Sequence, residues 1–355
     1  LEVRVLDVRV LEVRILEVRV LKVRILEVRV LEVRRRRMSS NCIDLGEVAK
    51  TFGGTRAVRD LNLQIPSGSL CGFLGPNGAG KSTTIRMIMS IIRPDRGSLR
   101  VLGGDARDHK DRSGYLPEAR GVYRKMKVAD YLRYIGRLKG VDAASLRKLI
   151  TESLERIGLP GVEKKRCEEL SKGMQQKVQF LAAIIHKPEL IILDEPFSGL
   201  DPVNAMLLHD LIRELHDEGR TILFSTHVLH QAERMCDRIV MIDQGSKVLD
   251  DELETIRERF DPRTIIAEPL GDPAELSSLL KNAPEVESIE IDDEGRVHAR
   301  LRQDIDADRV MAAAIAGGPL RSIERARTTL DEVFLHLVNR PLQHGAADPA
   351  EAAHV

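Results

Sequence analysis

The sequence lacks the long apolar runs and the charge imbalance that mark several classes of protein. No stretch of 18 or more consecutive apolar residues occurs, so no membrane-spanning helix is predicted. No continuous apolar segment follows the first charged residues, which argues against a secretory signal peptide. The 55 basic residues balance the 55 acidic ones, so the composition gives no electrostatic case for a nucleic-acid partner. We therefore expect a cytoplasmic protein that binds no nucleic acid.

Cysteine is scarce, and its spacing matches no metal site. Cys42, Cys71, Cys167 and Cys236 lie far apart and form no CxxC pair. Single thiols at such distances are typical of small buried residues in a reducing compartment. We expect all four to be buried.

The first residues of the chain are a repeat. Residues 1–35 contain seven copies of a five-residue unit, beginning LEVRV and LDVRV. A period of five matches neither the alternation of a strand nor the 3.6-residue turn of a helix. We interpret residues 1–37 as a translated short DNA repeat upstream of a start at Met38, or as a disordered extension. A small β-solenoid and a basic surface-binding arm are the alternatives.

The stretch LGPNGAGKSTT (74–84) places three glycines, a lysine and hydroxyls close together. Glycine costs backbone entropy, so the cluster indicates a backbone that wraps closely around a ligand. The spacing Gly75-x-x-x-x-Gly80-Lys81-Ser82 is that of a loop whose N–H groups face a polyphosphate, with Lys81 on the β- and γ-phosphates and Ser82 on Mg²⁺. The expected phosphate loop consists of Gly75, Pro76, Asn77, Gly78, Ala79, Gly80, Lys81, Ser82 and Thr83.

The neighbouring segments support this loop. Residues 69–74 form a short apolar run of strand length, and apolar residues at helical spacing continue from Ile85 to Ile92. A helix that begins at Lys81 would aim its positive end at the anion. A chance Gly-rich hairpin, the alternative, explains neither neighbour.

Two adjacent carboxylates follow a buried strand in ELIILDEPFSGLD (189–201). Leu190 to Leu193 are continuously apolar, as in a central parallel strand buried on both faces. Ligands bind at the carboxyl ends of such strands, where Asp194 and Glu195 lie. Asp194 is placed to hold Mg²⁺ and Glu195 to orient or deprotonate the attacking water. The alternative is an ordinary acidic turn after a strand.

Two weaker signals follow the same pattern. Ser171 is a candidate cap for a helix whose apolar face runs through Met174, Val178, Leu181 and Ile185, and whose N-terminus would present N–H groups to a phosphate. The apolar strand 222–226 ends at His227. A lone histidine is often structural, but at this edge of the sheet we expect a contact with a γ-phosphate.

These signals, in this order, resemble those of the ATP-binding subunits of ABC transporters, over about Ile43 to Leu249. Residues 75–82 are similar to Walker A, LSKGM to the family signature and LIILDE to Walker B. The resemblance implies an α/β P-loop NTPase of the ABC type, with a helical subdomain at about 119–165. It implies that Mg²⁺ and ATP bind in a head-to-tail dimer, in which the signature of one chain faces the phosphates held by the other. That signature consists of Ser171, Lys172, Gly173 and Met174.

The resemblance also implies roles for residues outside the main motifs. Phe52 matches the aromatic residue that stacks on adenine, with a core aromatic residue as the alternative. Asp201 matches the D-loop, His227 the switch histidine and Glu118 the Q-loop position. The catalytic residues implied are Glu195, His227 and Lys81.

Three positions depart from the usual family pattern. Lys172 replaces a glycine of the signature, Met174 replaces its glutamine, and Glu118 replaces the Q-loop glutamine. These variants resemble the sodium- and drug-efflux branch (NatA-like), which carries a C-terminal appendix ending much like TLDEVFLHL. A carboxylate donates no hydrogen bond unless it is protonated, so Glu118 changes the expected contact with Mg²⁺ and water.

A second domain is expected after the ATPase domain of residues 38–250. The predicted order of elements over 260–340 is strand, helix, two strands, helix and strand, as in a small α+β ferredoxin-like module. A closing amphipathic helix is expected over 329–338, and residues 341–355 are expected to be disordered. The strands are expected at 263–268, 286–291, 296–301 and 320–325, and the helices near 273–281 and 305–316.

We interpret the chain as the ATP-hydrolysing subunit of an ABC exporter. It would couple hydrolysis to a separate membrane permease, contacted through the helical subdomain, at the inner face of the cell membrane. The resemblance implies a homodimer or a pairing with a paralogous ATPase subunit. The alternative is a soluble ABC ATPase that acts on ribosomes or DNA, against which the single motif set and the lack of sustained heptads argue. An inactive regulator is opposed by the intact Lys81, Glu195 and His227.

Overall fold

The computed structural model describes residues 40–119, 121–302 and 307–338. The expectations for residues 1–37 and 341–355 concern parts of the chain outside these ranges. The chain divides into two compact units, the first ending at Asp250 and the second beginning at Asp251. Each unit has its own hydrophobic core.

The first unit is built on a six-stranded sheet in the order β5-β6-β7-β3-β8-β9, and the pairs from β5 through β8 are parallel. Every residue of β3, β6 and β7 is buried, which confirms the prediction of a central strand from the apolar run 190–193. The strands are β3 (Leu70–Leu74), β5 (Ser113–Leu116), β6 (Leu190–Asp194), β7 (Thr221–Thr226), β8 (Arg238–Asp243) and β9 (Ser246–Glu252).

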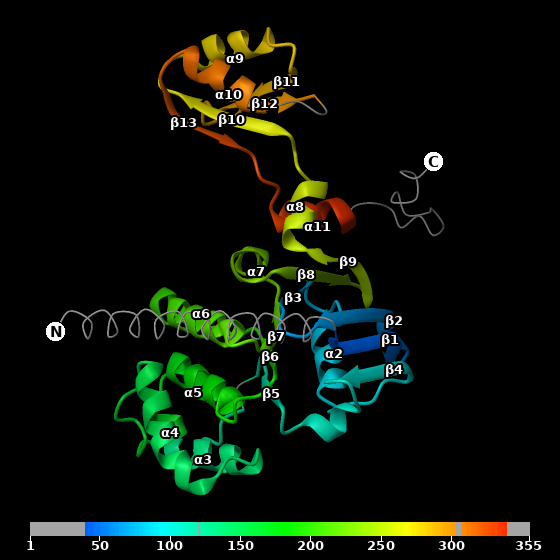
Figure 1. Ribbon diagram of the computed structural model, residues 1–355, viewed down its shortest axis with the longest axis vertical. Helices are drawn as coiled ribbons and strands as arrows, with labels where there is room; N and C mark the ends of the chain where they lie inside the picture. Colours follow the sequence, from blue (N-terminus) through cyan, green and yellow to red (C-terminus); the bar gives the residue numbers. More distant parts are fainter. Residues whose placement is uncertain (1–39, 120, 303–306, 339–355) are drawn as a thin grey trace, which may run out of the picture. The chain divides into compact units, whose positions relative to one another are not determined.

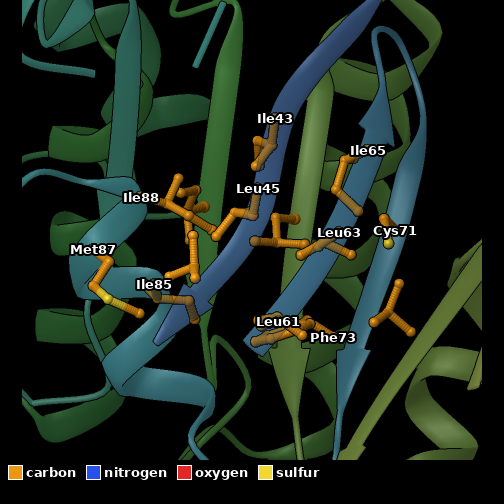
Figure 2. Packing of buried hydrophobic residues seen from close by; sticks show 14 of the residues in the cluster. Ile43, Leu45, Leu61, Leu63, Ile65, Cys71, Phe73, Ile85, Met87 and Ile88 are labelled. Carbon is orange, nitrogen blue, oxygen red and sulfur yellow. The ribbon is translucent and has the colours of Figure 1, made fainter. Parts of the chain in front are cut away.

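The first unit also contains an antiparallel sheet, which the sequence patterns do not predict. Its order is β2-β1-β4, with β1 at Asn41–Phe52, β2 at Thr55–Pro66 and β4 at Arg96–Val101. Gly53 and Gly54 both adopt positive φ, so the chain reverses directly between β1 and β2 and needs no crossover helix. Figure 2 shows Ile43, Leu45, Leu61, Leu63 and Ile65 of this sheet packed with residues of β3 and α2 in one core.

Helices cover the parallel sheet. Helix α2 starts at Lys81, as predicted, but ends at Ile88 and not near Ile92, because Ser90 adopts a left-handed φ of 55°. Helices α3 and α4 lie within the expected helical region and gather with α5 beside the β5 edge of the sheet, away from the antiparallel sheet (Figure 1). The helices are α2 (Lys81–Ile88), α3 (Val128–Leu138), α4 (Ala143–Arg156), α5 (Lys172–Ile184), α6 (Pro202–Asp217) and α7 (Leu229–Met235), with short 3-10 turns η1 (Ala106–His109) and η2 (Cys167–Glu169).

The second unit contains a four-stranded antiparallel sheet in the order β11-β12-β10-β13. The chain order βαββαβ with this strand order confirms the ferredoxin-like prediction. Ile265, Ala267, Val297 and Ala299 pack under α9 and α10. The elements are α8 (Leu253–Arg259), β10 (Thr264–Pro269), α9 (Pro273–Lys281), β11 (Val286–Ile291), β12 (Val297–Leu301), α10 (Ala307–Ala316), β13 (Leu320–Arg325) and α11 (Leu330–Val338).

The cysteine side chains and the lengths of the helices bear on two of the expectations. All four cysteines are free and buried, as expected. Within the described ranges, no helix is long and apolar enough to cross a membrane.

Candidate functional site

The phosphate loop connects the end of β3 to the start of α2. Gly80 caps the helix in a left-handed conformation, and a Cβ atom on it would lie 2.4 Å from the carbonyl oxygen of Ala57. A Cβ atom on Gly75 would lie 2.1 Å from the carbonyl oxygen of Ile242. Real Cβ atoms do not approach backbone this closely, so these two glycines are required by space as well as by φ.

Lys81 lies inside this loop with its ammonium group on the loop's own backbone. Its Nζ donates to the carbonyl oxygens of Gly75 (2.5 Å) and Pro76 (3.1 Å). Burial lowers the pKa of Lys81, while the charges of Glu195, Asp194 and Glu118 act in the opposite direction. The structure therefore brings these three carboxylates, two from the motif 189–201 and one from the loop after β5, near one lysine.

Asp194 is the last residue of β6 and only 3% exposed. Burial raises the pKa of Asp194, and the charges of Glu118 and Glu195 raise it further. The hydroxyls of Ser225 and Ser82 lie close enough to oppose this shift. Ser82 and Asp194, predicted from separate motifs, therefore lie side by side.

Replacing Asp194 by asparagine is expected to raise the melting temperature at pH 7. A carboxyl whose pKa is raised by folding stabilises the fold while protonated, at and below about pH 4, and this contribution is lost as the pH rises through the folded-state pKa. At pH 7 the wild-type protein carries the cost of a buried charge, and the asparagine variant does not. Thermal denaturation of both proteins without nucleotide or Mg²⁺, at pH 7 and pH 4.5, measures the increase in melting temperature. This increase should be smaller at the lower pH.

The control for this experiment is Asp210→Asn, because the Asp210 side chain is 79% exposed. It should change the free energy of unfolding by less than about 0.5 kcal/mol. A lower melting temperature of Asp194→Asn at pH 7 would mean that the partners of Asp194 outweigh its burial.

Glu195 is held by the last residue of β7 and the residue that follows it. Its Oε1 accepts hydrogen bonds from the backbone N–H of His227 (2.8 Å) and from His227 Nδ1 (2.6 Å), and its Oε2 accepts one from the Thr226 hydroxyl (3.0 Å). The carboxylate is thus fixed by three donors at the carboxyl end of the neighbouring strand β7. The sequence predicts a phosphate contact for His227 but indicates neither its bond to Glu195 nor the hydrogen bond from Thr226.

The backbone of Glu195 is strained. Its φ is 50°, in the left-handed region that a non-glycine residue rarely adopts. Its N–H donates to the carbonyl oxygen of Ser225 (2.9 Å), so the turn is anchored to β7 directly after the strand. Such conformations cost about 1–3 kcal/mol and persist where the surroundings impose them, typically at functional sites.

The signature residues begin helix α5, as predicted. Ser171 caps the helix by accepting a hydrogen bond from the Met174 N–H (3.3 Å). Ser171 and Lys172 are exposed, while Gly173 and Met174 are half-buried. The side-chain bond of Ser171 thus stays within its own helix.

The remaining predicted residues lie at the edges of the site. The Phe52 ring is 49% exposed, with the Lys50 ammonium 5.4 Å from its centroid, so the core alternative is wrong. Asp201 caps α6 and accepts from the N–H (3.0 Å) and the side-chain amide (2.5 Å) of Asn204, bonds that lower the pKa of Asp201. Glu118 is exposed in the loop after β5.

Known families match both units of the chain. The ABC transporter family model matches residues 58–198, and the model of the C-terminal domain of DrrA1-3-like ATP-binding proteins matches residues 252–338. The ABC transporter ATP-binding protein YhaQ of Bacillus subtilis (strain 168) is 44% identical over 224 residues, which are 63% of this chain and 75% of that protein. The Nod factor export ATP-binding protein I of Rhizobium leguminosarum bv. viciae is 34% identical over 310 residues, 86% of this chain and 97% of that protein.

Solved structures agree with these families. The structure of an ATP-binding subunit of an ABC transporter matches with a TM-score of 0.58 and 30% identity, over 62% of this chain and 93% of that one. In this chain the phosphate loop lies between β3 and α2, Asp194 and Glu195 lie at the end of β6, and His227 follows β7. The chain therefore belongs to the ATP-binding proteins of ABC transporters, which hydrolyse ATP to power transport.

Proposed function

We propose that Mg·ATP is hydrolysed where the phosphate loop meets the ends of β6 and β7, and that this reaction drives export. The observation that carries the proposal is the meeting of Lys81, Asp194, Glu195 and His227 at the carboxyl ends of three adjacent strands, β6, β7 and β3. Ligands of open parallel sheets bind at this edge. The export direction is supported by the Nod factor export relative.

The residues beside Lys81 fit a magnesium ion. Mg²⁺ prefers oxygen ligands and usually takes one or two from the protein, with the others from phosphates and water. The Ser82 hydroxyl and the Asp194 carboxylate supply such a pair. The described residues contain no group of three or more His, Cys, Asp or Glu that would form a metal cage by itself, in agreement with a metal that arrives with the nucleotide. Bound there, Mg²⁺ would neutralise charge on the phosphates.

Each residue has a defined part in the reaction. Lys81 exchanges the carbonyl oxygens of Gly75 and Pro76 for phosphate oxygens, and the N-terminal end of α2 adds its N–H groups. Glu195 accepts the proton of the attacking water, and His227 and Thr226 hold its carboxylate in place. The exposed ring of Phe52 offers a face for adenine.

A second chain would complete the site. We infer a head-to-tail dimer in which Ser171, Lys172, Gly173 and Met174 face the phosphates bound by the partner, with the Asp201 loop beside them. The exposed Ser171 and the positive N-terminal end of α5 suit an anion from outside the chain. The partner is a second copy or a paralogous ATPase subunit.

Mixing two inactive variants tests this dimer. Ser171→Arg blocks the signature and Lys81→Ala removes the phosphate contact, so each variant alone should lose ATPase activity. A mixed dimer contains one composite site with neither substitution and one with both. ATPase assays on a 1:1 mixture should therefore recover activity at about one site per mixed dimer. An absence of recovery, with dimers verified by light scattering, would exclude action in trans.

The permease is proposed to dock on the helical region, which places the chain at the cytoplasmic face of the membrane. A cavity of about 160 Å³ lies between β5, α3 and α5, lined among others by Tyr115, Tyr131 and Gln179. Exposed Tyr123, Tyr134 and Leu138 lie on and before α3. Apolar side chains exposed beside a cavity are typical of a protein interface. Co-purification with a polytopic membrane protein, lost in Tyr134→Asp, would support this surface.

A further inference from the structure

Helix α5 carries three buried polar side chains, which is unusual for a helix at the centre of a domain. Gln176, Lys177 and Gln179 are 2%, 5% and 3% exposed. Buried polar groups must find hydrogen-bond partners, and each of these three reaches a different segment of the chain. Gln176 donates to the carbonyl oxygen of Pro196 (3.2 Å), and Lys177 donates to Asn204 Oδ1 (2.7 Å).

Gln179 binds the loop that contains Glu118. Its Oε1 accepts a hydrogen bond from the Gly121 N–H (3.2 Å), and its Nε2 donates to the carbonyl oxygens of Ala119 (3.2 Å) and Pro117 (3.5 Å). The side-chain amide thus uses both its acceptor and its donors on a single loop. Leucine offers neither, and an ionised glutamate offers no donor.

This loop depends on Gln179 for its backbone bonds. The ladder between β5 and β6 ends at Leu116. After Leu116, in the described part of residues 117–121, the hydrogen-bond partner of the backbone groups is the Gln179 side chain. The two carbonyl groups that it holds flank Glu118, so the amide fixes the position from which the Glu118 side chain starts.

Gln179 links the loop that contains Glu118 to helix α5, and both of these elements contribute residues to the proposed site. The charge of Glu118 acts on Lys81 and on Asp194. Helix α5 carries Gly173 in its first turn and has Ser171 as its N-cap residue. A helix transmits displacement along its axis with little bending over 13 residues.

We propose that Gln179 is a positioning residue for ATP hydrolysis, which holds Glu118 at a fixed place relative to the signature end of α5. This proposal rests on the proposed function, since it takes Glu118 to face the nucleotide. Gln179 touches no nucleotide and acts through the loop. A displacement of about 1 Å at a reacting site can lower a rate by about 10²-fold, so one buried amide is sufficient for a large effect.

The main experiment compares Gln179→Leu with Gln176→Leu. Both replace a buried glutamine on the same helix, but only the first frees the loop. Hydrogen exchange read on a peptide containing Gly121 should be at least about tenfold faster in Gln179→Leu and unchanged in Gln176→Leu, because exchange reports local opening. In steady-state assays, kcat of Gln179→Leu should fall about tenfold or more while KM for ATP stays within about twofold, the pattern of a lost transition-state interaction.

Gln179→Glu supplies a second test in case the leucine variant folds poorly. Its carboxylate accepts from the Gly121 N–H but opposes the carbonyl oxygens of Pro117 and Ala119, so burial and these dipoles raise its pKa. Protonation restores a donor. Its activity relative to wild type should therefore rise as the pH falls from 8 to 6, which a purely structural defect would not produce.

Two results would overturn the proposal. Unchanged exchange at Gly121 in Gln179→Leu would mean that the amide does not hold the loop. Faster exchange with unchanged kcat would mean that it holds the loop without serving catalysis. Failure of the proposed function is distinct from both, since it would appear as normal hydrolysis by Glu195→Gln in the same assay.

Discussion

Replacing Glu195 by glutamine should lower ATP hydrolysis by about 10²–10⁴-fold, the contribution of a general base. Glutamine keeps the shape of glutamate and retains an oxygen for the His227 donors, so the turn after β6 should survive. What it loses is the ability to accept the proton of the attacking water. ATP binding should be retained, and ATP should accumulate a stable dimer, visible by size-exclusion chromatography.

The control for this substitution is Glu218→Gln, at the C-terminal end of α6, whose side chain is 47% exposed. It makes the same chemical change outside the site and should leave kcat within about twofold. Near-normal turnover of Glu195→Gln, with folding verified by circular dichroism, would remove Glu195 from the catalytic role.

Gly75→Ala should abolish ATP binding and destabilise the first unit by about 3 kcal/mol or more. The added Cβ would lie 2.1 Å from the carbonyl oxygen of Ile242 on β8, where it meets backbone and not a movable side chain. The φ of Gly75, 151°, is also unfavourable for alanine. Either β3 and β8 separate or the loop changes shape, and a changed loop no longer presents its N–H groups to phosphate.

Gly78→Ala separates the two causes of this effect. Gly78 also has a positive φ, of 82°, but a Cβ atom on it would meet nothing within 4 Å. The Gly78→Ala variant should therefore lose only about 1–2 kcal/mol of unfolding free energy, because only backbone strain destabilises it. Urea denaturation and fluorescent-nucleotide titration of both variants measure the difference. Equal losses in the two variants would show that close packing against Ile242 is unimportant.

Patterns along the chain predicted the parts of the fold that follow from local periodicity. The apolar run 190–193 indicated β6 because a strand covered on both faces needs no polar side chain. The βαββαβ order of the second unit was predictable because each element is short and bounded by turn residues. The β2-β1-β4 sheet could not be predicted in this way. Within it, Ile43 pairs with Val101, a partner 58 positions away that no local pattern indicates.

The site was predictable where chemistry and spacing coincide. The spacing of the phosphate loop indicated Lys81 and Ser82 because few other structures need three glycines beside them. Nothing in the sequence indicated that Gln179 is buried, since helical periodicity assigned only Met174, Val178, Leu181 and Ile185 to the core. Helix α5 is covered by α3, α4 and β5, so polar positions outside that stripe are buried as well. Such positions are identified only by their tertiary partners.

The left-handed backbone of Glu195 has a consequence for engineering this protein. Glycine or asparagine suits a φ of 50° better than glutamate does, so selection for thermostability alone would favour Glu195→Gly or Glu195→Asn. Either change would relax the turn and remove the carboxylate together. At position 195, stability and ATP turnover therefore favour different side chains. A library screened only for heat resistance would enrich well-folded, inactive proteins.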